Sequence, residues 1–309
     1  MTATLIHWPL LSENQPAPIW TGTDFLIGTE RRKVLCYHER TSGWNKDLTR
    51  MHEDITGAHH YIDRASRQQA IDALAPLLKH PHPVLLEVGC SSGFFLEDLR
   101  SKAKHATLVG SDFIGEPLQE LAGRLPGIPI LQFDITHCPF GDSSFDGIVM
   151  LNVLEHIEND LEALKQVYRI LKPGGLVVIE VPAGPHLYDF YDQHLMHYRR
   201  YQSKSLKSLA EKAGFQVERV SHLGFFLYPP FALVKKINRI RGKKMSESER
   251  QSKVSRQIRK GNTNRFMYAL MKMELALGKY LNYPVGIRCL MTLKKQQGDQ
   301  NVLYKKTSK

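Results

Sequence analysis

The sequence is poor in cysteine and contains no long apolar run. Only four of its 309 residues are cysteine, and none of them belongs to a CxxC pair. Such isolated thiols argue against a disulfide framework or a zinc site and predict a cytoplasmic protein with reduced cysteines. No stretch of 18 apolar residues is available to cross a bilayer. The N-terminal residues also lack the basic flank and apolar core of a signal peptide.

Acidic residues are scarce in the last quarter of the chain. Residues 235–309 hold 20 Lys and Arg against four Asp and Glu, whereas the whole chain carries a formal net charge of only +11. This asymmetry predicts a basic surface that meets lipid, nucleic acid or phosphate. A solvated, solubilising tail would have the same composition, and the sequence leaves both readings open.

Short apolar runs alternate with amphipathic segments through the middle of the chain. The sequence lacks internal repeats, and residues 1–60 look irregular. Strands are expected at 83–89, 106–111, 129–133, 145–151, 175–182 and 216–222, and helices at 62–80, 94–102, 116–125, 160–171 and 203–213. Ser203 is the expected N-cap of the last of these helices, and Gly214 its terminating residue. Apolar strands that alternate with helices predict an α/β fold with a parallel sheet covered on both faces.

The C-terminal third is less regular. Residues 222–234 are apolar but interrupted by Pro229-Pro230, and a basic run follows to Lys260. A helix is expected over 264–281, with Phe266, Leu270, Met273, Leu277 and Leu281 on one apolar stripe. A late strand is expected over 285–293.

The strongest functional signal is the turn Glu87–Gly93 between the first expected strand and its helix. Glycine at such a turn lets the backbone approach a ligand at the helix N-terminus. A dinucleotide fingerprint would need a third glycine where Phe94 stands. Asp112 and Asp134 end the next two strands, where an open α/β sheet binds its ligands. Asp112 is well placed for two ribose hydroxyls, and Asp134 for an adenine amino group.

Taken in order, the stretches EVGCSSG, GSD, FDIT, LNVLEHI and LKPGG resemble the class I S-adenosylmethionine-dependent methyltransferases, particularly the broad type 11 group. The resemblance covers about residues 58–222. A narrower resemblance, carried by residues 59–68, residues 181–201 with their HYRRY, and the final strand, is to a bacterial subgroup with an HxRRY signature. The resemblance implies a Rossmann-like, seven-stranded, mostly parallel sheet whose last strand is antiparallel. It does not define the methyl acceptor.

The resemblance implies S-adenosylmethionine as the cofactor. The methionine part would lie at the glycine turn, where Ser91 replaces the middle glycine of the family pattern, and the ribose and adenine would lie at the following two strand ends. The expected cofactor contacts are Glu87, Gly89, Cys90, Ser91, Gly93, Asp112, Phe113, Asp134, Ile135 and Asn152.

The expected organisation places one catalytic core between less regular segments. It comprises a cap or lid segment (1–60), a methyltransferase core (61–222), a basic, partly apolar helical insertion (223–284), the final core strand (285–295) and a flexible basic tail (296–309).

His156 is the candidate catalytic base. Methyl transfer is an in-line displacement, so a base is needed only when the acceptor is protonated. The competing reading is that His156 and Glu155 only cap a helix and fix the loop. Asn152, Glu155 and His156 also share one face of a turn, and some related methyltransferases bind magnesium through an E-x-x-E-H version of it. Since Asn152 removes one negative charge, no metal is expected.

The segment after the fifth strand normally overhangs the acceptor pocket in this fold. Its arginines, tyrosines and histidines suit a phosphate, carboxylate or sugar. The expected acceptor contacts are Tyr188, Asp192, His197, Arg199 and Arg200. Alternatively, the two arginines make structural ion pairs with Asp192 or a neighbouring acid.

The leading functional hypothesis is O- or N-methylation of a small-molecule or lipid-linked glycan acceptor at the inner face of an anionic membrane. It rests on the apolar residues 225–234 and the adjacent basic residues Lys235, Lys236, Arg239, Arg241, Lys243 and Lys244. An RNA methyltransferase is the alternative, although nucleic acid is disfavoured because no RNA-binding signature or N/D-PPY motif is present. A non-catalytic S-adenosylmethionine-binding scaffold is the third hypothesis. A nicotinamide oxidoreductase is disfavoured by Phe94.

Overall fold

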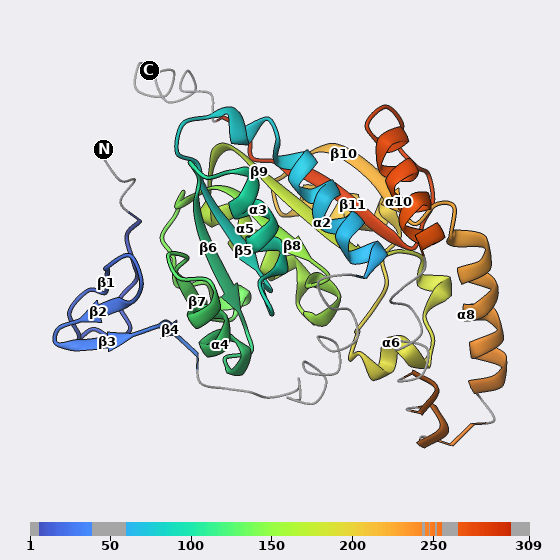
Figure 1. Cartoon of the computed structure of the whole chain (residues 1–309), viewed down its shortest axis with the longest axis horizontal. Helices are drawn as coiled ribbons and strands as arrows, with labels where there is room; N and C mark the ends of the chain where they lie inside the picture. The colour runs from blue at the N-terminus through green and yellow to red at the C-terminus, as the bar shows by residue number, and fades with distance from the viewer. Residues whose placement is uncertain are drawn as a thin grey trace, which may run out of the picture.

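A sheet of eight strands runs through the protein, with helices on both faces (Figure 1). The computed structural model describes residues 6–38, 60–242, 245–246, 248–250, 252–254 and 265–297. In spatial order the strands are β10 (Gln216–Leu223), β11 (Arg288–Lys294), β9 (Leu171–Pro182), β8 (Phe145–Leu151), β5 (Val84–Val88), β6 (Thr107–Asp112), β7 (Ile130–Gln132) and β4 (Val34–Cys36). The predicted mostly parallel α/β sheet is confirmed. Its last strand, β11, pairs antiparallel with both β9 and β10.

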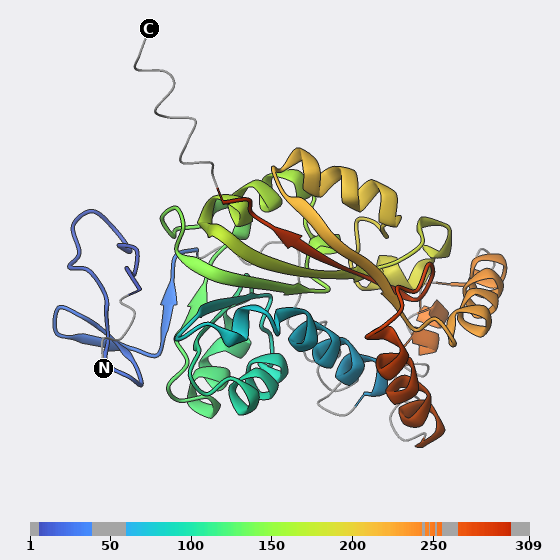
Figure 2. The same ribbon diagram turned by 90° about the horizontal axis from the view of Figure 1, so that it is seen from above.

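The strands are buried because both faces of the sheet carry amphipathic helices. The helices of the core are α2 (Tyr61–Leu74), α3 (Phe94–Lys102), α4 (Glu116–Arg124), α5 (Asp160–Ile170) and α7 (Ser203–Lys212). The apolar sides of α2, α3 and α4 pack in one core cluster, and those of α5 and α7 in another. Figure 2 shows the two groups on opposite sides of the sheet. Since every β5 residue is buried, its near-continuous apolar run is what a two-sided sheet requires.

The N-terminal segment is more ordered than its sequence suggests. Strands β1 (Ile19–Trp20), β2 (Phe25–Ile27) and β3 (Glu30–Arg32) form a small antiparallel sheet. The chain then adds β4 to the main sheet, parallel to β7, beside the small sheet (Figure 1). The expectation of irregular structure is therefore wrong for residues 19–36. Strands of two or three residues are too short to show an alternating pattern.

Several predicted element boundaries need correction. Helix α2 ends at Leu74, and a separate 3-10 turn, η1 (Leu77–Lys79), follows it, so the expected single helix to residue 80 is wrong. Ser203 is the first residue of α7, whose N-cap is Gln202. Gly214 follows the C-cap with φ +104°, as expected for a terminating glycine.

Two helices with defined bounds lie in the described residues between β10 and β11; the first differs from the sequence expectation, and the second confirms the helix expected over 264–281. Helix α8 (Tyr228–Gly242) has Pro229-Pro230 in its first turn, so these prolines begin a helix instead of interrupting one. Helix α10 (Arg265–Gly278) packs against α2. None of the helices in the described ranges has the length and hydropathy needed to cross a membrane.

Both helices bury polar side chains and expose apolar ones. Lys235 and Asn238 of α8 and Glu274 of α10 are buried. The outward apolar side chains, each between 36% and 66% exposed, are Leu233, Val234, Ile237, Ile240, Phe266, Met273 and Leu277. The predicted stripe of α10 is therefore largely exposed. Lys235 does not belong to the basic surface expected from sequence, while Lys243 and Lys244 lie outside the described residues.

Candidate functional site

The predicted cofactor residues gather at the carboxyl ends of four adjacent parallel strands. The order β8–β5–β6–β7 places Asn152, the glycine turn, Asp112 and Asp134 next to one another along this edge. Ligands of open α/β sheets bind at this edge.

The turn after β5 is held in a conformation that favours glycine. Gly89 has φ +79° and Gly93 has φ +70°. A Cβ atom on Gly89 would lie 2.3 Å from Val153 Cγ2, and one on Gly93 would lie 2.3 Å from Leu121 Cδ1. Gly89 N and Cys90 N both donate to the Ser111 carbonyl, at 2.8 and 2.9 Å. Glycine is therefore required at both positions by the backbone conformation and by the close packing of Val153 and Leu121.

Asp112 links this turn to the end of β6. Its carboxylate accepts hydrogen bonds from Ser91 N and Ile114 N, each at 2.9 Å. These bonds fix the carboxylate at the strand end, where it is partly exposed. The Phe113 ring lies beside the ring of His38, with 5.2 Å between the ring centroids. His38, close to β4, is a neighbour of the site that sequence patterns did not indicate.

The end of β7 continues the same edge. Asp134 Oδ1 accepts hydrogen bonds from Thr136 N at 2.8 Å and Thr136 Oγ1 at 2.7 Å, at the start of the 3-10 helix η2 (Ile135–His137). Asp134 remains partly exposed, whereas Ile135 is buried. A partly exposed acid beside an apolar side chain suits an adenine ring and its amino group.

Glu87, buried at the end of β5, has an oxygen without a partner. Its Oε2 makes no hydrogen bond in the structure. Burial and the neighbouring Asp112 charge raise the pKa of the Glu87 carboxyl well above its ordinary value. A buried acceptor without a donor is costly unless a ligand supplies one. The ammonium group of a bound S-adenosylmethionine would fit this oxygen, so the residues present suit that cofactor.

The predicted acceptor residues divide between two ion-pair sets. Asp192, on the short helix α6 (Phe190–His194), accepts from Arg200 Nε at 2.7 Å and from Lys235 Nζ at 2.9 Å, and all three side chains are buried. Arg199 pairs instead with Asp160 at 2.7 Å. Tyr188, after the 3-10 turn η4 (Pro185–Leu187), donates to the His197 carbonyl at 2.7 Å. The ion pairs weighed as the alternative to acceptor binding are thus present.

Glu155, His156 and His197 form a compact cluster near the end of β8. The first two lie on the 3-10 turn η3 (Leu154–His156), and His197 lies beyond α6. Each residue offers a metal-ligand atom, and these atoms lie within 4.8 Å of one another. The two imidazole rings meet edge to face at 4.7 Å. The sequence predicted that His197 contacts the acceptor, but it did not predict that His197 lies close to Glu155.

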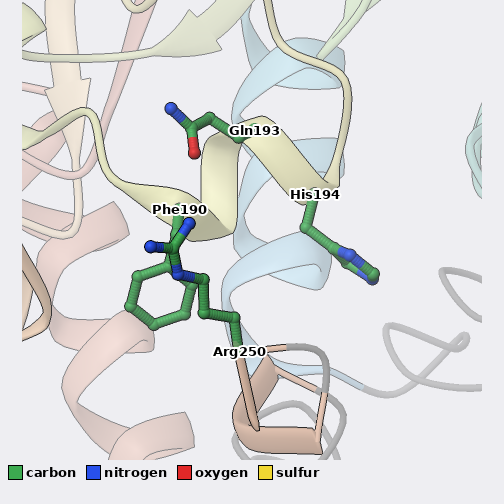
Figure 3. Close-up of a pocket in the computed structure, with 4 residues that line it drawn as sticks. All are labelled: Phe190, Gln193, His194 and Arg250. Atoms are coloured by element: carbon green, nitrogen blue, oxygen red, sulfur yellow. The ribbon is translucent and has the colours of Figure 1, made fainter. Parts of the chain in front are cut away.

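Cavities also occur away from these strand ends. A small cavity of about 80 Å³ is lined by Phe190, Gln193, His194 and Arg250. Figure 3 shows Arg250 reaching toward Phe190, while His194 points to a different side. A larger space of about 670 Å³ lies between the N-terminal segment, with Trp8 and Trp20, and the amino end of β6. Neither contains the predicted cofactor residues.

Comparison with known proteins places the site in a family. The family model described as "Methyltransferase domain" matches residues 58–220, which include all the predicted cofactor and acceptor contacts.

The curated relatives cover the same region. A Mycolicibacterium smegmatis protein named "Probable S-adenosylmethionine-dependent methyltransferase" is 27% identical over 136 residues, which are 43% of this chain and 52% of that protein. A demethylmenaquinone methyltransferase of Deinococcus radiodurans is 28% identical over 145 residues, covering 44% of this chain and 59% of that protein. The chain thus spans little more than half the length of these relatives.

A solved structure agrees in fold. Phosphoethanolamine N-methyltransferase 2 of Haemonchus contortus, in complex with S-adenosyl-L-methionine, superposes with a TM-score of 0.54 at 16% identity, over 83% of this chain and 59% of that one.

Proposed function

Since the chain belongs to the methyltransferase domain family, we propose that it transfers the methyl group of S-adenosylmethionine to a small-molecule or lipid-linked acceptor by O- or N-methylation. The observation that carries this proposal is the contiguous set of ligand-accepting groups at the ends of β8, β5, β6 and β7. A glycine turn, a buried acid with an unpartnered oxygen and two strand-end carboxylates stand there in the order that the cofactor requires.

The bound cofactor supplies an activated methyl group on a sulfonium, and the protein aligns the acceptor with it. In this proposal Glu87 accepts from the ammonium group, Asp112 from the ribose hydroxyls and Asp134 from the adenine amino group, with Ile135 against the ring. Such alignment contributes several kcal/mol to lowering the barrier, because it removes the entropic cost of bringing the reactants together.

The acceptor side lies toward His156 and His197. The base role of His156 stays a prediction. The acceptor roles of Asp192 and Arg200 are harder to support, because their polar groups are already engaged with each other inside the protein. We therefore place the acceptor against the cluster of Glu155, His156 and His197, where a buried carboxylate lacks a partner.

Calorimetric titration of the full chain tests the cofactor assignment. S-adenosylmethionine and S-adenosylhomocysteine should each bind with micromolar affinity and a stoichiometry near one. NAD⁺ should not bind, because Phe94 stands where a dinucleotide turn has its third glycine. A folded chain that binds neither sulfur nucleotide would contradict the proposal.

We further propose that α8 contacts an anionic membrane surface. The outward face of α8 carries Leu233, Val234, Ile237 and Ile240, and the exposed Lys236 and Arg241 border it. An apolar face with basic borders is the pattern of a helix that lies in a lipid interface. A lipid-borne acceptor would then be presented close to the site.

Vesicle co-sedimentation tests this contact. The chain should bind vesicles that contain phosphatidylserine, and the double variant Lys236→Gln, Arg241→Gln should bind them about thirtyfold more weakly, since each basic residue near the surface contributes ~1 kcal/mol. The matched control is Lys204→Gln, Lys207→Gln, which removes the same charge from the exposed face of α7. Equal binding by both variants, or salt-sensitive binding to RNA in place of vesicles, would contradict the membrane proposal.

A further inference from the structure

We propose that Glu155, His156 and His197 form a binding site for a divalent transition-metal ion of the zinc class, beside the proposed methyl-transfer site. The sequence predicted no metal, and the magnesium face that it raised consisted of Asn152, Glu155 and His156. In the structure the Asn152 side chain turns to Glu180, to which it donates at 3.4 Å. His197, 41 positions after His156, joins the cluster instead.

Glu155 is the group that most clearly lacks a partner. Its side chain is 0% exposed, and neither carboxylate oxygen makes a hydrogen bond. Its backbone carbonyl, by contrast, accepts from Tyr198 N at 2.9 Å. A carboxyl group buried in this way costs free energy unless a cation or a donor faces it.

His197 is oriented as a metal ligand would be. Its Nδ1 lies 3.1 Å from Asp192 Oδ1, so Nδ1–H donates to the carboxylate and the Nε2 lone pair remains available. Metal-binding histidines are commonly held by such a carboxylate, which fixes the tautomer and makes the ring more basic. Asp192 is itself held by Arg200 and Lys235.

The ligand types and their spacing select the ion. Two imidazoles and one carboxylate suit zinc and its neighbours, whereas magnesium and calcium prefer oxygen ligands alone. A tetrahedral zinc ion brings its ligand atoms to ~3.4 Å from one another. The atoms of the cluster lie within 4.8 Å, so small side-chain rotations complete the site. Three protein ligands leave a position open for a water or substrate oxygen.

The role of the ion rests on the proposed function, although its binding does not. An acceptor hydroxyl at the open position would lose its proton to solvent, because a bound cation lowers the pKa of an oxygen ligand. The oxygen lone pair then forms the bond to the methyl carbon as the carbon–sulfur bond breaks. Its electron pair stays on sulfur, so the products are the methylated oxygen and S-adenosylhomocysteine. His156 would be a ligand in this arrangement and not a base.

Metal titration of the full chain tests the site. Chelator-stripped, dialysed protein should bind one equivalent of Co²⁺ with a visible spectrum of histidine coordination, and Zn²⁺ should displace it. Glu155→Gln and His197→Asn should each weaken Zn²⁺ binding at least tenfold, and Glu155→Asp should retain part of it. His194→Asn, which alters a histidine outside the cluster, should bind like the wild type.

Each variant is also titrated with S-adenosylmethionine. This titration checks, independently of metal binding, that the variant is folded and that its cofactor site is intact. The metal site would be overturned if the wild type did not bind Zn²⁺ stoichiometrically. It would also be overturned if Glu155→Gln and His197→Asn both bound Zn²⁺ with the affinity of the wild type. If the chain binds Zn²⁺ at the cluster but not S-adenosylmethionine, the metal site stands and the proposed function fails. If it binds S-adenosylmethionine but not Zn²⁺, only the metal site fails.

Discussion

Asp112→Ala is expected to weaken S-adenosylmethionine binding at least a hundredfold. The Asp112 carboxylate stands partly exposed at the end of β6, where Ser91 N and Ile114 N hold it in place. Two hydrogen bonds from ribose hydroxyls to a charged acceptor contribute ~3 kcal/mol or more together, and alanine removes both. It also releases the Ser91 amide, which loosens the glycine turn. Calorimetric titration measures the loss directly.

Two further variants separate these contributions. Asp112→Asn keeps one acceptor oxygen, so its affinity should lie between those of the wild type and the alanine variant. Asp142→Ala removes an exposed acid near the opposite end of β8, where Asp142 pairs with Arg169, and it should leave the affinity unchanged. An Asp112→Ala protein that binds within about threefold of the wild type would remove Asp112 from the cofactor site.

Asp192→Ala is expected to be the most destabilising single substitution near the acceptor side. The Asp192 side chain is 0% exposed and accepts from Arg200, Lys235 and His197. Removing one member of a buried ion-pair set leaves the others uncompensated and costs about 3–5 kcal/mol. The free energy of unfolding, measured by urea denaturation, should fall by that amount.

Glu211→Ala is the matched control for this substitution. Glu211 pairs with Lys207 at 3.8 Å on the surface of α7, where both side chains are about half exposed, so its loss should leave the urea midpoint close to that of the wild type. If Asp192→Ala were as stable as the wild type but bound acceptor poorly, the acceptor role predicted for Asp192 from the sequence would be favoured over the structural one.

Much of the fold could be predicted because its signals are local. The buried run of β5 and the apolar face of α5 can each be recognised within a short, continuous stretch of sequence. Gly89 and Gly93 mark a turn whose backbone conformation other residues adopt only with strain. The three-residue strand β4 was missed for the opposite reason. It is held by pairing with β7, 96 positions away in the sequence, and not by any pattern of its own.

The acceptor side was harder to predict because long-range contacts make it. Lys235 lies 43 positions from Asp192, and nothing around it distinguishes it from its exposed neighbour Lys236. Composition therefore assigned both lysines to one basic surface, although one of them is buried. Likewise, Glu155 and His156 were visible as neighbours on one turn, but no local pattern indicated that His197 would face them. Only the return of the chain after α6 brings the three together.

The burial of Lys235 has a mechanical consequence for the molecule. Its ammonium group joins α8 to both Asp189 and Asp192, at 2.7 and 2.9 Å, and Asp192 in turn holds the ring of His197. A shift of α8 along or away from α6 therefore has to separate two buried ion pairs and alters the charge that faces the imidazole. Lys235, together with Asn238 of the same helix, which donates to Asp189 at 3.3 Å, thus couples the helix with the outward apolar face to the histidine beside the strand ends.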